Sequence, residues 1–526
     1  MGGGASVVRH GRDALAGALI ACLSAAPLAA EAPLAAIEWL QDTLLVPDAG
    51  ELYPVTPPTG DAWIDGAITM RPLDRVNPDA VGLFPPARVG LPRDFWGPST
   101  AEELAPLVAA LPLDTLPALR MLAYRLLLAE FDAPRGAPPA AQGSPLLAAR
   151  IDKLYDFGAL DQALALLDTL DSRDAGLKLR WLEIALLLGD EEPVCRRVLT
   201  GEIPFPFEAA RIYCLARSGD WPAAEAAHDA VEGEGGLPPP YDMLIARFLE
   251  VEGHVDADPI VPLTGLPAQL SPLAWRMLEA IGEPVSTHGL PVAFAHADLR
   301  GTIGWRAQIE AAERLVRSGA LAPNRLLGLY TQRAAAASGG IWDRVRAVQR
   351  LEAALALDDP DAIGPALVAA WTQMEAAELE MALVALFAER LRDIPLDGAA
   401  TEVARSIGHL SDAYEVHALT APGAGPRAEL LAAIARGLPP DPDLPGDAIE
   451  AAVAEAFAPS PELPAGAAER LAEGRRGEEV LRVLDRIGSG SDPRMLAEGL
   501  VLLRHLGFED IARRTALQAL LLDRRG

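Results

Sequence analysis

The stretch YDFGAL at residues 155–160 decides the fold, because in it one helical pattern ends at Gly158 and another begins within a few residues. The same break returns as LLGD at 187–190, as RSGDW at 217–221 and at Gly253, so that the glycines lie 31, 30 and 34 residues apart. A glycine can adopt the left-handed conformation that closes a helix, and an aspartate after it can cap the next one. The pattern predicts successive helical hairpins.

A second pair of breaks, at Gly477 and Gly507, repeats the spacing near the C-terminus. Small residues early in the second helix of a unit, Ala163, Ala223 and Ala224, complete a pattern that resembles tetratricopeptide-type repeats. The resemblance is degenerate, since no single unit carries the full family pattern. It implies an all-α fold of stacked helical hairpins, a tetratricopeptide-like α-solenoid or superhelix whose concave face binds other molecules.

The composition favours helices and argues against nucleic-acid binding. Hydrophobic residues make up 50% of the 526 residues and aromatic residues only 5%, which is typical of helices more than of sheets. The chain has 74 acidic and 45 basic residues, a formal net charge of −29. Such a charge repels phosphate backbones and anionic lipid head groups. We therefore expect no nucleic-acid partner.

The N-terminus predicts export. Basic residues at 9–12 precede an apolar run over residues 14–28 and the small residues Ala29 and Ala30, so residues 1–30 are interpreted as a signal peptide cleaved after Ala30. The expected location is the periplasm. An alternative is a lipoprotein anchored through Cys22, which ends the lipobox-like run LIAC, and membrane contact is expected only in that case. An uncleaved anchor is disfavoured by Pro27 and by the shortness of the run.

The rest of the chain divides into four segments of different residue composition. Residues 31–98 are rich in Pro and Gly but also carry aromatic residues, and we interpret them as an extended arm laid along a helical body. Helix is expected to begin at Ser99, with Glu102 completing a capping box. Residues 99–282 are interpreted as tetratricopeptide-like repeats, 283–359 as a polar, glycine-broken helical segment and 360–526 as C-terminal helical repeats.

Two cysteines, Cys195 and Cys214, remain after removal of the signal peptide. They lie on expected helices at 191–199 and 207–216, each nine or ten residues from the middle of the intervening turn. In an antiparallel helix pair they would therefore face each other at the same height. We predict a disulfide bond, which an oxidising compartment would permit. The alternative is two buried free thiols.

Catalytic, metal and cofactor signatures are missing from the sequence. There is no phosphate-binding loop, no HExxH pair and no cysteine cluster. His288 and His296 are interpreted as ordinary polar residues, and GSGSD at 488–492 as a turn between helices with Asp492 near a cap. A comparison with the helical domains of soluble lytic transglycosylases would cover the scaffold alone, because the chain has no Glu-Ser dipeptide. We expect no catalytic residue, no metal and no cofactor.

Polar, aromatic and glycine residues concentrate between residues 282 and 359. The runs HADLRG at 296–301, NRLLGLY at 324–330 and SGGIWD at 338–343 resemble a family of exported α-proteobacterial helical-repeat proteins. Some of its members carry an "antifreeze glycopeptide-related" label, which reflects alanine content. The resemblance spans most of the chain after the signal peptide and implies no activity.

Five residues of this segment are candidate binding residues, because Trp, Tyr and Arg concentrate the energy of protein interfaces: Asp298, Arg300, Trp305, Tyr330 and Trp342. The alternative is that the two tryptophans fill gaps between helices and that Asp298 pairs with Arg300 or caps a turn.

The expected function is that of a non-catalytic periplasmic scaffold that binds a protein partner of the cell envelope. A loose similarity of architecture to helical periplasmic proteins of the flagellar motor suggests motility as the process. The alternative is a peptidoglycan- or glycan-active envelope enzyme that uses carboxylates in residues 282–359.

Overall fold

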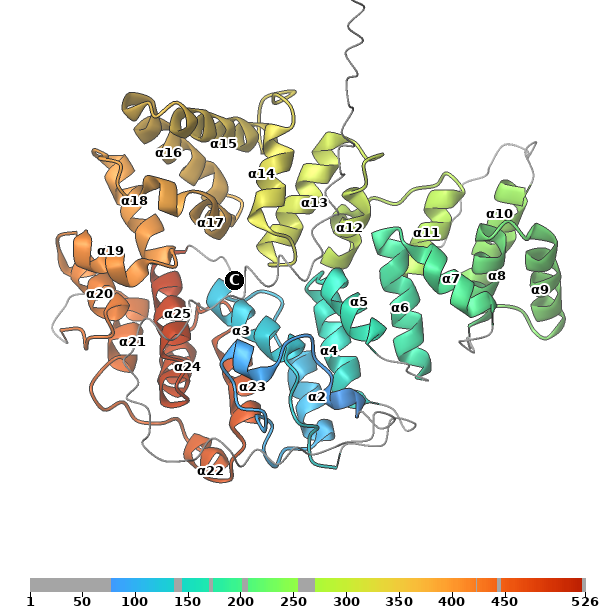
Figure 1. Cartoon of the computed structure of the whole chain (residues 1–526), viewed down its shortest axis with the longest axis horizontal. Helices are drawn as coiled ribbons and strands as arrows, with labels where there is room; N and C mark the ends of the chain where they lie inside the picture. Colours follow the sequence, from blue (N-terminus) through green and yellow to red (C-terminus); the bar gives the residue numbers. More distant parts are fainter. Residues whose placement is uncertain are drawn as a thin grey trace, which may run out of the picture. The chain divides into compact units, whose positions relative to one another are not determined.

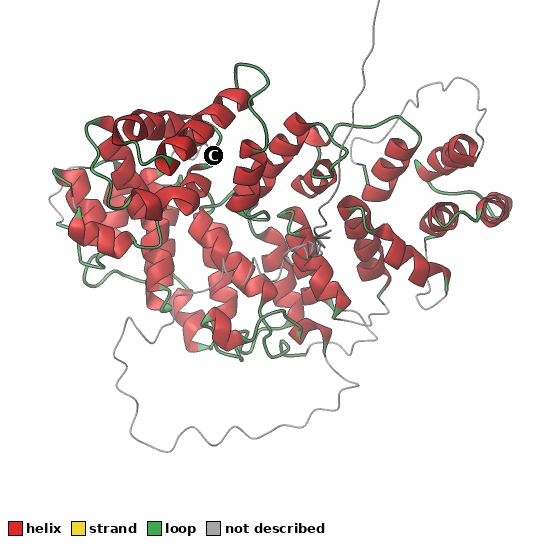
Figure 2. Ribbon diagram, turned by 45° about the horizontal axis from the view of Figure 1, so that its top comes forward, coloured by secondary structure: helices red, strands yellow, loops and turns green. Residues whose placement is uncertain are grey.

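Helical hairpins follow one another along the chain in the computed structural model, which describes residues 77–136, 144–169, 174–200, 207–253, 270–421, 423–441 and 446–522 (Figure 1). These described residues form 24 α-helices, joined by loops and short 3-10 helices, and contain no strand (Figure 2). The predicted all-α class is confirmed. The predicted signal peptide, Cys22 and residues 31–76 of the arm lie outside the described residues.

The helices of the first part of the chain are α2 (Ala101–Ala110), α3 (Pro117–Leu128), α4 (Pro145–Asp156), α5 (Leu160–Asp168), α6 (Ala175–Leu188), α7 (Glu191–Leu199), α8 (Glu208–Arg217), α9 (Trp221–Gly233) and α10 (Tyr241–Gly253). The middle helices are α11 (Pro272–Ala280), α12 (Ala295–Asp298), α13 (Trp305–Arg317), α14 (Pro323–Thr331), α15 (Ile341–Ala356), α16 (Pro360–Glu375) and α17 (Glu380–Leu391). The last helices are α18 (Ala399–Leu410), α19 (Tyr414–Thr420), α20 (Pro426–Ala435), α21 (Ala448–Ala456), α22 (Ala467–Ala472), α23 (Arg476–Ile487), α24 (Pro493–His505) and α25 (Glu509–Leu521).

Neighbouring helices pack against each other in sequence. The pairs α7 with α8, α8 with α9, α13 with α14, α15 with α16 and α23 with α24 are examples. Each pair buries an apolar stripe that its helices could not bury alone. All described helices belong to one unit, residues 44–526. The subdivisions within it at residues 282 and 359 remain predictions.

Four of the six predicted glycine breaks, Gly158, Gly189, Gly219 and Gly507, separate consecutive helices, whereas Gly253 is the last residue of α10 and the residues after it lie outside the described ones. Gly158, Gly189 and Gly219 have φ angles of 77°, 78° and 87°, and each separates two consecutive helices. Gly477 was expected to be such a break, and this prediction is wrong: it lies inside α23, and Gly474, with φ of 81°, separates α22 from α23. The sequence alone does not decide which glycine ends the helix, because Gly474 and Gly477 lie only three residues apart.

The start of α2 also differs from the expectation by one residue. Thr100, not Ser99, is the N-cap: its hydroxyl accepts from the Glu103 N–H at 3.2 Å, and Glu103 Oε2 accepts from the Thr100 N–H at 2.8 Å. Ser99 is buried, and its hydroxyl donates to Glu478 of α23 at 3.3 Å. The Ser99 side chain, which the local sequence assigns to the N-cap of α2, therefore makes a tertiary contact with α23 instead.

Residues 77–98, the described part of the expected arm, pack on the helical body. They form the 3-10 helices η2 (Pro78–Ala80) and η3 (Pro86–Val89) and turns, in place of a fully extended strand. The Leu83 N–H donates to the carbonyl of Leu128 at the end of α3, at 2.7 Å. The rings of Phe95 and Trp96 lie 5.1 Å and 5.2 Å from that of Phe131. These aromatic contacts explain why a proline-rich segment keeps large apolar side chains.

The first helices also contact the last ones. Helix α2 packs on α23, and α3 packs on α23 and α25. The Thr115 hydroxyl donates to the Gly488 carbonyl at 2.9 Å, and the Ala118 N–H donates to Gln518 Oε1 at 2.8 Å. An open stack of repeats makes contacts between neighbours only, so these bonds between remote segments depart from it.

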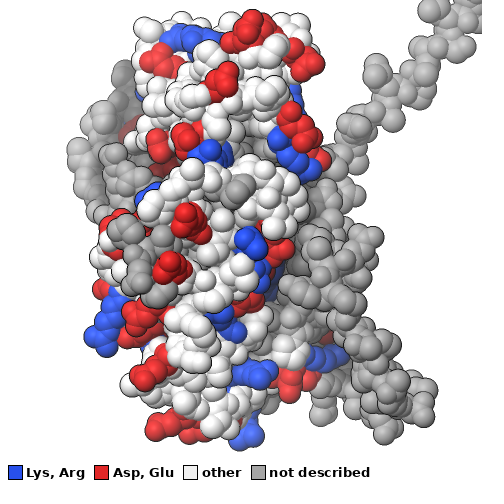
Figure 3. Space-filling model, turned by 90° about the vertical axis from the view of Figure 1, so that its left-hand side faces the viewer, with Lys and Arg blue, Asp and Glu red and all other residues white. Residues whose placement is uncertain are grey.

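Charged side chains of both signs are interspersed over the described residues of the face drawn in Figure 3, without a continuous basic patch there. Many of the arginines form ion pairs with acidic residues of the same or a neighbouring helix, such as Arg390 with Glu352 at 2.7 Å. None of the helices in the described part of the chain combines the length and the apolar character that a bilayer crossing requires.

Candidate binding pocket

The five predicted binding residues occupy three different settings. Asp298 ends α12, Arg300 follows it, Trp305 begins α13, Tyr330 lies near the end of α14 and Trp342 lies in the first turn of α15. Only the two tryptophans come together at a surface pocket. The other three hold helices to one another.

Arg300 belongs to a network of ion pairs among helices. Its guanidinium binds both carboxylate oxygens of Glu279 in α11, with 3.1 Å between Nη1 and Oε2. Glu279 also pairs with Arg276, whose Nη2 lies 3.2 Å from Glu191 Oε1 in α7. Burial raises the pKa of Glu279, but the hydrogen bonds from Arg300 and Arg276 outweigh burial, so the pKa lies below its usual value. This arginine is therefore engaged inside the helical body.

Asp298 is partly buried and accepts a hydrogen bond from the Thr287 hydroxyl. Burial raises its pKa, although this hydrogen bond and the charge of Arg300 lower it. The bond ties the end of α12 to the 3-10 helix η5 (Thr287–Gly289). Neither Asp298 nor Arg300 lines the surface pocket described below.

Tyr330 is buried, with only 1% of its surface exposed. Its hydroxyl donates to Glu313 Oε1 in α13 at 2.7 Å, and Arg344 of α15 binds both oxygens of the same carboxylate at 2.8 and 2.6 Å. Burial raises the pKa of Tyr330 well above its ordinary value. The three side chains join α13, α14 and α15, and Tyr330 is not accessible to a partner in this structure.

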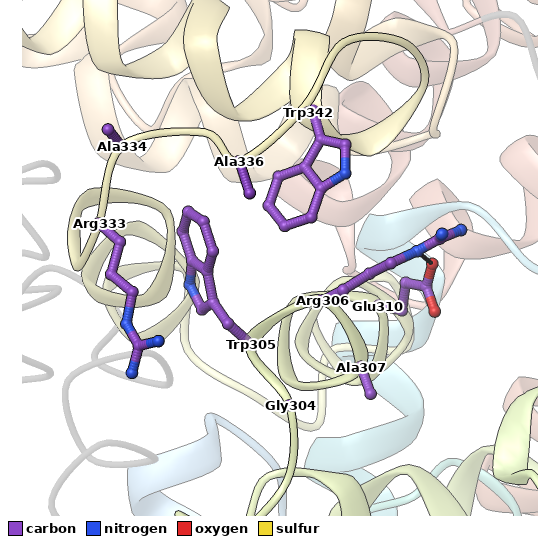
Figure 4. A pocket seen from close by; sticks show the side chains of 9 residues that line it. All are labelled: Gly304, Trp305, Arg306, Ala307, Glu310, Arg333, Ala334, Ala336 and Trp342. Carbon is purple, nitrogen blue, oxygen red and sulfur yellow. Dashed lines mark hydrogen bonds and ion pairs between the residues drawn. The ribbon is translucent and has the colours of Figure 1, made fainter.

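Trp305 and Trp342 line a surface pocket of about 530 Å³ between α13, α15 and the loop at 332–340 (Figure 4). Their ring centroids lie 5.0 Å apart, and the ring planes are inclined by 44°. Both side chains are partly exposed. The indole N–H of Trp305 donates to the Leu329 carbonyl at 2.9 Å, which fixes that ring. The two inclined indoles thus touch each other and form a wedge-shaped apolar wall of the pocket.

The polar side chains that line this pocket are arginines and one glutamate. Arg306 Nε donates to Glu310 Oε1 at 2.8 Å along α13, near Trp342 in Figure 4. Arg333 lies beside Trp305, on the side away from Trp342. Its guanidinium forms no ion pair with any other described residue, whereas its backbone carbonyl accepts from Gln349 at 2.7 Å. Glu310 is the one acidic residue among those lining the pocket.

Small residues keep the pocket open above the two indoles. Ala334 and Ala336 contribute only methyl groups from the loop, which returns to α15 through Gly339 and Gly340 with φ angles of 91° and 52°. Sequence reasoning did not select Arg306, Glu310, Arg333 or the alanines. The signal available was the run RAAAASGG at 333–340, in which small residues and positive-φ glycines stand next to Trp342.

The features interpreted as non-catalytic have ordinary structural roles. The Asp492 carboxylate caps α24 by accepting from the Arg494 and Met495 N–H groups at 2.9 and 3.1 Å, so the prediction of a turn at 488–492 is confirmed. His296 is buried, with its Nε2 2.6 Å from the Gly158 carbonyl, whereas His288 is exposed. Within the described ranges no cluster of three or more His, Cys, Asp or Glu residues could hold a metal ion.

Cys195 of α7 and Cys214 of α8 lie at disulfide distance, with 2.02 Å between their sulfur atoms and 5.1 Å between their Cα atoms. The predicted pairing is confirmed. Both residues are buried in a core that also contains Tyr213 and Phe248. The bond therefore joins consecutive helices of one hairpin.

Comparison of the chain with protein-family models, with curated proteins and with solved structures finds no significant match.

Proposed function

We propose that the protein is a non-catalytic helical-repeat scaffold of a bacterial cell envelope, which binds a protein partner through the Trp305–Trp342 pocket. The consecutive helix pairs and the glycine breaks at Gly158, Gly189 and Gly219 support the interpretation as an α-solenoid of tetratricopeptide-like type. Such folds act by presenting surfaces to other molecules.

The proposed location is the periplasm, reached by cleavage of the signal peptide after Ala30. The Cys195–Cys214 pair supports it, because disulfides persist in oxidising compartments. Anchoring through a lipidated Cys22 is the alternative for the same compartment. Sequencing of the N-terminus of the exported chain separates the two: a chain that starts near Glu31 supports cleavage, and a blocked Cys22 supports the lipoprotein.

One observation carries the binding proposal: two partly exposed indoles meet at the surface beside Arg333, which forms no ion pair with another described residue. Exposed paired aromatic faces are unfavourable in water unless a ligand covers them. Tryptophan and arginine are also the residues that most often dominate binding energy at protein interfaces. The pocket volume, about 530 Å³, falls in the usual range for ligand sites.

The enzyme alternative has less support from this pocket. Hydrolysis of a glycosidic bond generally uses two carboxyl groups on opposite sides of the bond, one of them as an acid. The pocket offers Glu310 alone, and the Arg306 guanidinium already binds that carboxylate. The lining side chains thus suit binding better than glycoside hydrolysis.

Site-specific crosslinking in the envelope of the source bacterium tests the proposal. A photoreactive benzoylphenylalanine in place of Ala337, which is exposed beside the pocket but outside its lining, should give a discrete adduct with one envelope protein. The same group in place of Leu357, which is 78% exposed and outside the pocket, is the control and should give none. Adducts that are absent at residue 337, or equal at both positions, would contradict the proposed function.

A further inference from the structure

We propose that the ligand of the Trp305–Trp342 pocket is a proline-containing peptide segment in the polyproline II conformation. This inference rests on the proposed function, since it specifies the chemistry of the partner that the pocket receives. Three observations support the inference: the inclination of the two indole rings, the hydrogen-bond donors around these rings and the small residues of the loop above them.

The two inclined indoles suit a compact, rigid aliphatic ring. The two indole planes, 5.0 Å apart at their centroids and inclined by 44°, offer apolar faces on which a pyrrolidine ring can pack. A polyproline II helix repeats every three residues, about 9 Å along its axis, so successive prolines can meet an aromatic groove at regular steps. Because proline already fixes this conformation, binding orders little additional chain.

The hydrogen-bonding groups of the pocket are mainly donors. The Trp342 indole N–H makes no hydrogen bond within the described part of the chain, and the Arg333 guanidinium is likewise unpaired there. Proline residues present carbonyl acceptors and no N–H, so a proline-rich backbone complements a site of this kind. The indole N–H of Trp342 can donate to a peptide carbonyl while its ring contacts proline.

The same groups disfavour two other ligand classes. Sugar hydroxyls need acceptors as well as donors, and the only acceptor side chain in the lining, Glu310, already accepts from Arg306. An ammonium cation would suit the aromatic faces, but Arg306 and Arg333 would repel it. A carbonyl-rich, uncharged peptide backbone meets neither difficulty.

Peptide arrays test this inference with the purified full chain. The probes are short capped peptides, each with a central Pro-Pro pair and varied flanking residues, beside a matched set in which alanine replaces both prolines. A chitin oligosaccharide represents the glycan alternative. We expect proline peptides to bind at least about tenfold more tightly than their alanine counterparts. Equal binding of the two sets, or binding of the oligosaccharide alone, would overturn the inference.

Four variants and two controls locate the binding. Trp342→Ala should weaken binding on the order of tenfold or more, and Trp342→Phe, which keeps an aromatic ring without the N–H, should lose part of it. Ala336→Leu should block the wedge, whereas Ala337→Leu, an exposed neighbour outside the lining, should not. Arg333→Ala should weaken binding, with Arg392→Ala as its exposed control. Binding that survives Trp342→Ala and Ala336→Leu would place the peptide elsewhere and contradict the assignment.

The two proposals fail in different ways. A pocket-specific adduct from residue 337 with no preference for proline peptides would reject the ligand class and leave the scaffold function standing. Proline-peptide binding that depends on Trp342, without any adduct in the envelope, would reject the function and leave the ligand class standing.

Discussion

Gly477 shows at the level of one residue how closely the segment before α2 approaches α23. A Cβ atom at this position would lie 2.6 Å from a ring atom of Trp96 and 2.8 Å from the carbonyl oxygen of Phe95. Backbone at such a distance cannot move aside without a shift of the whole segment. Packing therefore requires a glycine at this position inside a helix, despite its low helix propensity.

Gly477→Ala should lower the free energy of unfolding by about 1–3 kcal/mol, because the overpacking outweighs the gain in helix propensity. Gly328→Ala is the matched control: Gly328 also lies inside a helix, α14, with open space around it, and alanine there should be neutral or stabilise by up to about 1 kcal/mol. Denaturant unfolding of both variants makes the comparison. Equal stability of the two would contradict the packing argument.

At the level of elements, the hairpin of α18 and α19 contains two histidines that are held neutral. The ring centroids of His409 and His417 lie 4.8 Å apart with the ring planes inclined by 82°, and the Nε2 atoms of both are buried and form no hydrogen bond with any described residue. Burial lowers the pKa of His409, and burial followed by the neighbouring His409 and Arg405 lowers the pKa of His417 to about 4. Protonation of either ring would place a charge between packed helices.

The sign of the pH dependence follows from these lowered pKa values. The unfolded chain takes up protons on both histidines below pH about 6.5, whereas the folded chain does so only at lower pH. Their contribution to stability is thus complete above about pH 6.5 and is lost as pH falls toward 4. The melting temperature of His417→Gln should fall less than that of the unchanged protein between about pH 7 and pH 5. Parallel curves for the two proteins would contradict this account.

Local sequence predicts the elements well where local forces decide them. The expected helices at 191–199 and 207–216 correspond to α7 (Glu191–Leu199) and α8 (Glu208–Arg217), because caps and apolar periodicity act within a few residues. The disulfide pairing followed from these two helices. Burial is less predictable from local sequence. Composition places Tyr330 among the candidate binding residues, and only the packing of α13, α14 and α15 shows that its hydroxyl binds Glu313.

At the level of the whole molecule, the contact between the first and last helices was beyond sequence reasoning. It joins residues that are hundreds of positions apart, such as Ala118 and Gln518, and no local pattern encodes it. The N-cap residue of α3, Leu116, has no side chain that can cap the helix, so Gln518 of α25 supplies the acceptor. The juxtaposition of Trp305 and Trp342 has the same origin, since it depends on how α13 and α15 pack.

Gln518→Leu should destabilise the protein by about 1–3 kcal/mol, because it leaves the buried Ala118 N–H without an acceptor. Gln332→Leu, at an exposed position, is the control and should change stability by less than about 0.5 kcal/mol. Thermal unfolding monitored by circular dichroism measures both. An effect of Gln518→Leu no larger than that of the control would mean that the contact between the chain's remote helices adds nothing to stability.

The central claim, that the Trp305–Trp342 pocket binds a partner, is tested most directly by crosslinking from residue 337 together with the melting temperature of each variant. Trp342→Ala should abolish the adduct while the protein stays folded at the temperature of the assay, because this indole is partly exposed, packs on Trp305 at the surface and makes no hydrogen bond within the described residues. Tyr330→Phe, which removes the bond to Glu313, should lower the melting temperature and keep the adduct. An adduct that persists in Trp342→Ala, or that disappears only in step with stability, would contradict the claim.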